Sequence, residues 1–320
     1  ALLRNLGDSE AVANFFEVAQ WTGNGDLRFV IATTADVLGC ATGPMNVVLS
    51  DYAKTELEPQ NAIPVGMTDT SIPAAVNISL LKVLRYANPA LRKIVGQSLR
   101  QLGCSRRTRL HPKDNGAAGI IARWPSLYSL DVEVHALSQH IGPPICHLTD
   151  KGPVLLIDRD LLDNGSGTDP ATLFEVGMAL APLSMGIVCW ANAEDLQIPL
   201  AACVIRQFAP DFLCDDSRTT HFDLDESKLQ KYLERQEYTS VMGLMLELSG
   251  SINADGIMEQ AKVLDRAFRR LALIPIRFPG EIIANLKKEN EHDFKDALSY
   301  LLSERVTAMR KAIFEVPSET

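Results

Sequence analysis

The sequence has no long hydrophobic run, no paired-cysteine motif and no nucleotide-binding signature. The stretch closest to a membrane span, residues 176–193, is interrupted by Pro182, Gly186 and Asn192, so a spanning helix of about 20 apolar residues is excluded. The six cysteines form no CxxC pair, which leaves zinc ribbons and thioredoxin-type redox sites unsupported. Neither GxGxxG nor the Lys-Ser/Thr ending of a P-loop occurs.

Positive charge is also scarce. There are 31 basic and 40 acidic residues, which gives a net charge of −9 and argues against a general binder of nucleic acid or anionic membranes. With 46% hydrophobic and 22% charged residues, the composition is that of a folded globular protein. Most cysteines lie in apolar runs such as 187–190 and 202–204, which predicts buried, reduced thiols in a cytoplasmic protein.

Turn-forming residues divide the chain into three predicted parts. Residues 1–57 are predicted to form short helices separated by glycines. Pairs of such helices would fit the end of a helical-repeat region, although the sequence shows no fixed period. Residues 58–73 are rich in Pro, Ser and Thr and are predicted to be an exposed linker. Residues 74–320 then form the main domain.

The main domain is predicted to be α+β and predominantly helical, with a small sheet followed by a helical bundle. Alternating or continuous apolar residues predict three short strands, at 131–137, 144–148 and 153–157. Asp169-Pro170 is a helix start signal, and Pro182 is expected to bend or end that helix. Further helices are predicted at 74–103, where Asn88-Pro89 should split the segment in two, and at 196–207, 227–248, 254–273, 281–288 and 291–314.

A basic run is the first candidate site. Residues 88–113 contain no acidic and no aromatic residue but seven basic ones, a candidate interaction patch made of Arg92, Lys93, Arg100, Arg106, Arg107, Arg109 and Lys113. Nucleic-acid contact is disfavoured because no aromatic ring is present to stack on bases. A solvated or ion-paired face and a patch for a protein partner remain open.

A second candidate is a group of metal-ligand residue types. His135, His140, Cys146 and His147 lie within 13 residues of one another. Successive strand residues point to opposite faces of a sheet, so a straight strand cannot gather them. Separate surface histidines and a buried cysteine are therefore favoured over a metal site or a nucleophilic Cys146–histidine pair.

Residues 173–182, Leu-Phe-Glu-Val-Gly-Met-Ala-Leu-Ala-Pro, are predicted to form a helix directly after the sheet. In this order of elements the chain resembles a gluzincin-type metallopeptidase, in which a small sheet precedes a helix carrying HExxH and a later helix supplies a glutamate ligand. On this resemblance Met178 stands at the first histidine, Ala179 at the catalytic glutamate and Pro182 at the second histidine. Glu237 matches the third ligand, while Val241 replaces the usual aspartate.

The resemblance implies a zincin-like fold that has lost its metal ligands. A thioether is a poor zinc ligand, alanine cannot accept a proton, and one glutamate cannot hold zinc alone. We therefore expect no metal, no cofactor and no peptidase activity by this route. The chain is also similar to uncharacterised domains that follow tetratricopeptide-type repeats in large proteins of predatory and gliding bacteria, where the zincin-like helix likewise lacks its histidines.

The expected function is that of a pseudoenzyme: a non-catalytic protein-interaction or scaffold domain that binds other proteins. The basic run and the acidic segment 211–226 are candidate contact surfaces. The alternative is a cytosolic enzyme of another class that uses His135, His140, Cys146 or His147. A pocket containing two of these four side chains would favour the alternative.

Overall fold

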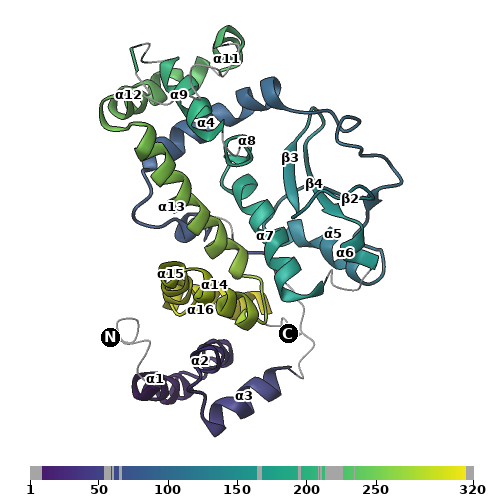
Figure 1. Cartoon of the computed structure of the whole chain (residues 1–320), viewed down its shortest axis with the longest axis vertical. Helices are drawn as coiled ribbons and strands as arrows, with labels where there is room; N and C mark the ends of the chain where they lie inside the picture. The colour runs from purple at the N-terminus through teal and green to yellow at the C-terminus, as the bar shows by residue number, and fades with distance from the viewer. Residues whose placement is uncertain are drawn as a thin grey trace, which may run out of the picture.

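The computed structural model gives the arrangement of most of the chain (Figure 1). It describes residues 9–53, 59, 61–64, 67–163, 168–193, 196–207, 209, 211–212, 226–233 and 235–314. The predicted fold class is confirmed: the protein is α+β and predominantly helical, with one small sheet. No helix within the described ranges is both long enough and apolar enough to cross a membrane.

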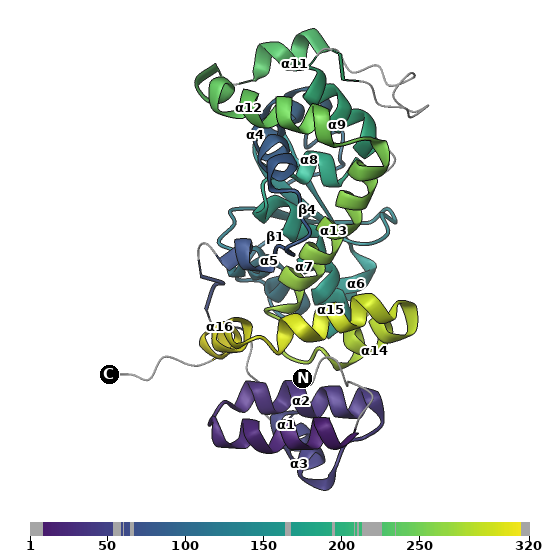
Figure 2. The same ribbon diagram turned by 90° about the vertical axis from the view of Figure 1, so that its left-hand side faces the viewer.

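The N-terminal part is a layer of three helices, α1 (Ser9–Trp21), α2 (Gly25–Leu38) and α3 (Gly43–Ala53). Asn24 caps α2 by accepting a hydrogen bond from the Leu27 N–H, and Gly39 ends it with φ 74°. The helices share a core of their own, made of Val12, Phe16, Ala19, Ile31, Ala32, Ala35 and Met45. Figure 2 shows this layer beside the C-terminal helices, apart from the sheet.

A buried ion pair joins this layer to the end of the chain. Arg310 is fully buried and donates to Asp26 through Nε (2.9 Å) and Nη2 (3.0 Å). Its third nitrogen, Nη1, donates to three backbone carbonyls, those of Leu273, Ile274 and Ile276. Arg277 stacks over the Tyr52 ring, with its Cζ atom 4.3 Å from the ring centroid. The N-terminal helices are therefore held against the main domain by specific contacts.

The predicted linker 58–73 is exposed at some described positions, Ala62, Pro64 and Asp69, and packed at others. Ile63 is buried, and its N–H donates to the Leu127 carbonyl at 2.6 Å. The short 3-10 helix η2 (Met67–Ser71) packs against a long helix of the main domain, and Ser71 is fully buried. The expected exposure is therefore wrong for Ile63 and Ser71 but holds for Ala62, Pro64 and Asp69.

The sheet has four strands in the order β1-β2-β4-β3. They are β1 (Arg109–Leu110), β2 (Glu133–Leu137), β3 (Ile145–Leu148) and β4 (Pro153–Asp158). The central strands β2 and β4 are parallel, and each edge strand runs antiparallel to its neighbour. The three predicted strands are confirmed. Strand β1 was not predicted, because two residues are too short to show alternation.

Helices cover one face of the sheet and extend away from it. They are α4 (Ile78–Val95), α5 (Ala117–Leu127), α6 (Asp160–Asp163), α7 (Pro170–Ser184), α8 (Val188–Ala191), α9 (Gln197–Arg206), α11 (Glu226–Tyr232), α12 (Arg235–Ser251), α13 (Ala254–Leu273), α14 (Gly280–Glu289), α15 (Glu291–Leu301) and α16 (Glu304–Phe314). Figure 1 shows α13 running diagonally beside α7, with α12 near one end of the molecule.

Several predicted helix boundaries are wrong. Helix α4 continues through Pro89, so the predicted split there is wrong, because packing holds the helix together despite one missing N–H group. Helix α7 ends at Ser184, two residues after Pro182. Conversely, the segments 227–248 and 291–314, each predicted as one helix, are each divided into two. Residues 96–103 form turns rather than the end of a second helix.

Candidate functional site

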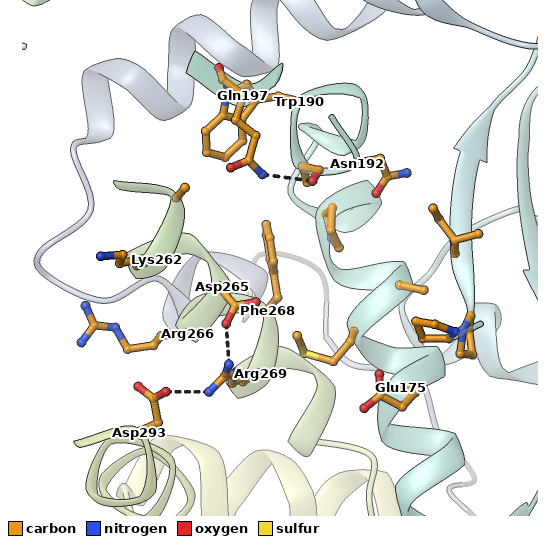
Figure 3. Close-up of a pocket in the computed structure, with 18 of the residues that line it drawn as sticks. Glu175, Trp190, Asn192, Gln197, Lys262, Asp265, Arg266, Phe268, Arg269 and Asp293 are labelled. Atoms are coloured by element: carbon orange, nitrogen blue, oxygen red, sulfur yellow. Dashed lines mark hydrogen bonds and ion pairs between the residues drawn. The ribbon is translucent and has the colours of Figure 1, made fainter. Parts of the chain in front are cut away.

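A cleft of about 820 Å³ lies between α7 and α13. Its walls also include the N-terminal end of β3, the end of α8 and the beginning of α15 (Figure 3). Apolar side chains line part of it, among them Trp190, Met258 and Phe268. A concave site with mixed apolar and charged walls is the usual form of a ligand-binding site.

Helix α7 places three of the predicted site residues in this cleft. Asp169 caps the helix, since its Oδ1 accepts the Thr172 N–H at 2.6 Å. From that start Met178, Ala179 and Pro182 fall on one face and line the cleft. Pro182 has no N–H to donate to the Met178 carbonyl.

The helix that packs on α7 is α13, not α12. Gly177 makes this contact close: a Cβ atom there would lie 3.0 Å from the Cα of Ala272 and 2.7 Å from the Tyr128 hydroxyl. Glu237, the predicted third ligand, is on α12, which packs against α4 and α9. The prediction that its helix faces α7 is therefore wrong, and its side chain lies outside the described residues.

Glu175 also lines the cleft, one turn before Met178 and Ala179 on the same face of α7. Its side chain is exposed to the cleft, yet the surrounding protein removes enough water to raise the pKa of its carboxyl. The negative charges of Asp265 and Glu289 add to this rise, and Arg269 opposes it. The residue was missed because only one register of the HExxH comparison was considered.

Ion pairs on the opposite wall hold the cleft in shape. Arg269 of α13 contacts Asp265 at 2.9 Å and Asp293 of α15 at 2.6 Å, so one guanidinium serves two carboxylates (Figure 3). Burial raises the pKa of Asp265, an effect that Arg269 opposes and Asp293 increases. A neighbouring contact joins Arg266 Nη1 to His292 Nε2 at 3.1 Å.

The edge of β3 that borders the cleft is closed to an added strand. Pro143 and Pro144 precede it and have no N–H to donate. The outward carbonyl of Cys146 accepts a hydrogen bond from the Asn192 side-chain amide, and α8 packs against the strand. The β3 edge at this cleft therefore offers no site for strand pairing.

The histidine and cysteine group is dispersed. His135 is buried and contacts the Thr108 hydroxyl at 3.0 Å, whereas His140 lies on a loop and contacts Asp158 at 2.7 Å. Strand register places Cys146 on the opposite face of the sheet from His135 and His147. None of the four residues lines the cleft.

Two observations bear on chemistry by this group. Burial, with a smaller effect from Cys189, raises the pKa of the Cys146 thiol to about 12, which does not suit a nucleophile at neutral pH. In the part of the chain that the structure describes, no three His, Cys, Asp or Glu side chains are grouped to hold a metal ion.

Members of the basic run differ in their contacts. The Arg92 side chain donates to the Asp150 carbonyl at 3.3 Å, and Lys93 lies over the Tyr232 ring. Arg109 pairs with Glu133 at 2.9 Å. The remaining members, Arg100, Arg106, Arg107 and Lys113, are exposed. Most of the acidic segment 211–226, the other predicted contact surface, lies outside the described residues.

Comparison with protein-family models, with curated proteins and with solved structures gave no match to this chain. Its function is therefore inferred from the geometry of the cleft and of the surface.

Proposed function

We propose that this protein is a non-catalytic protein-interaction domain whose cleft between α7 and α13 receives side chains of a partner protein. The single observation that carries the proposal is the cleft itself: an 820 Å³ opening floored by Met178, Ala179 and Pro182. Methionine and aromatic side chains adapt to differently shaped apolar groups, and the ion pairs around Arg269 supply polar contacts at one end.

We further propose that the domain is a degenerate gluzincin-like scaffold. Two features support this: a mixed sheet precedes α7, and a second long helix packs against α7 along the cleft. A second register is also possible, in which Glu175 stands at the glutamate of HExxH and Phe174 and Met178 at its histidines. In either register both histidines of HExxH are replaced by other residues. The acidic residue on the helix that faces α7 is Asp265 of α13.

An enzyme that uses the histidine and cysteine group has less support. Two of its side chains in one pocket would favour that alternative, and the cleft contains none of them. We also propose a cytoplasmic location, supported by four described cysteines that are free thiols, Cys40, Cys104, Cys146 and Cys189.

The test is selection from a displayed random-peptide library on the whole chain, followed by affinity measurements on the selected peptides. Ala179→Phe should fill the cleft and weaken binding by about tenfold or more, as expected when a ligand loses its pocket. Asn14→Phe adds the same ring to an exposed position on α1 and should leave binding unchanged.

Two outcomes would contradict the proposal. Selected peptides that bind Ala179→Phe as tightly as wild type would show that the cleft is not the binding site. Cleavage of those peptides by wild type, abolished by a conservative Glu175→Gln change, would show that the domain is an enzyme.

A further inference from the structure

Three arginines in one short loop have no ionic partner among the residues that the structure describes. Residues 98–109, which we call the arginine loop, contain four arginines and no acidic residue. Arg109 pairs with Glu133, whereas Arg100, Arg106 and Arg107 are exposed and make no side-chain hydrogen bond or ion pair in the described part of the chain. In a chain of net charge −9, they are three exposed positive charges on one short loop.

The arginine loop is anchored to the sheet. Leu102 is 8% exposed and packs with Leu137, Val154 and Leu156 on the face of the sheet opposite α7. Backbone hydrogen bonds fix the loop, from Cys104 N to Leu99 O (2.8 Å), from Thr108 N to Ser105 O (3.2 Å) and from Ala136 N to Thr108 O (2.8 Å). The arginines therefore project from a fixed backbone, which lowers the entropy lost when a partner binds.

The position of the loop limits how a partner can bind. The loop leads into β1, the edge strand farthest from the cleft in the sheet order. Strand β1 has two residues and is followed by Pro112, which has no N–H, so the edge offers little for strand addition. Recognition here depends on the arginine side chains.

We propose that the arginine loop is a docking surface for an acidic segment of a partner protein, separate from the cleft. Guanidinium groups form two parallel hydrogen bonds with a carboxylate, which gives geometric selectivity as well as attraction. A nucleic acid fits less well, because residues 88–113 contain no aromatic ring for base stacking and the net negative charge opposes a polyphosphate.

The experiment measures fluorescence anisotropy of a labelled peptide that alternates glutamate and serine, added to the whole chain at low salt. Wild type should bind it, and binding should weaken as salt is added. The double variant Arg106→Glu/Arg107→Glu should lose affinity for the peptide by about tenfold or more. Circular dichroism should show that this variant is folded, since both positions are exposed.

The matched control is Lys288→Glu/Arg305→Glu, which changes the net charge equally at exposed positions on α14 and α16. It should bind the peptide as wild type does. The proposal is overturned if wild type does not bind, if the loop variant binds normally, or if the control loses as much affinity. It is also overturned if an oligonucleotide of equal charge binds wild type more tightly than the peptide and depends on the same arginines.

Discussion

The β3 edge of the sheet is enclosed by α7, α8 and α13, whereas the β1 edge carries a loop of exposed arginines. Both regions are rich in charge. At the β3 edge Arg269 is shared by Asp265 and Asp293, so its charge is used within the fold. At the β1 edge Arg106 and Arg107 have no such partner within the described ranges of the chain. The number of charges in a segment therefore does not tell whether they hold the fold together or are available to a partner.

The largest expected effect tests the core under the enclosed edge. Leu180 of α7 is fully buried, and Leu180→Ala should lower the free energy of unfolding by about 2–5 kcal/mol, because it removes buried apolar surface and leaves a cavity. Leu102→Ala, under the arginine loop, should cost less, since Leu102 belongs to a smaller cluster. Urea unfolding of both variants checks the order, and an equal or reversed order would contradict it.

The next effect tests the contact between α7 and α13. Gly177→Ala should destabilise the protein by about 1–3 kcal/mol, because the new Cβ would meet the Ala272 backbone. Gly243→Ala on α12 is the matched control, since its Cβ would meet nothing within 4 Å. In that exposed helix alanine should stabilise by about 0.5–1 kcal/mol. If the melting temperatures of both variants change in the same direction relative to wild type, the close contact is refuted.

A smaller effect distinguishes the two kinds of arginine directly. Arg269→Gln should cost about 1 kcal/mol, because it leaves two carboxylates near each other without their shared cation. Arg106→Gln should change stability by less than about 0.5 kcal/mol, as is usual for an exposed side chain without partners. Chemical denaturation gives both values, and equal losses would remove the distinction between the two edges.

The smallest effect is a pH dependence at Glu175. Its folded-state pKa is raised above the ordinary 4.5, so the folded protein holds the proton more tightly than the unfolded chain does. Stability from this group is present below pH 4.5 and is lost as the pH rises through the folded-state pKa. Relative to wild type, Glu175→Gln should therefore gain melting temperature as the pH rises through this window. A constant difference at every pH would show that Glu175 does not titrate in this way.

Local patterns predicted the elements well. Alternation at 131–137 and the Asp169-Pro170 start signal each identified an element in the structure, because both reflect local geometry. Helix continuity across Pro89 could not be predicted, since tertiary packing overrides the local cost of a proline. Strand β1 could not be predicted either, because its pairing with β2 defines it more than its own sequence does.

The candidate site was predicted only in part. Met178, Ala179 and Pro182 were placed together correctly because helical spacing fixes a shared face. Glu237 was chosen from its spacing along the chain, and spacing cannot tell which of two later helices packs against α7. Glu175 could have been predicted to line the cleft, because it lies one helical turn before Met178 and Ala179. The unequal roles of the seven basic residues could not be predicted, because their partners are distant in sequence.

The pairing of Arg310 with Asp26 has a consequence for the order of folding. These residues are 284 positions apart, so the contact closes a loop that includes nearly the whole chain. Closing so long a loop costs entropy that only a largely formed interior can offset. During synthesis α1, α2 and α3 emerge well before α16, yet they gain this anchor only after α16 has been made. These three helices are thus secured long after their own residues have been translated.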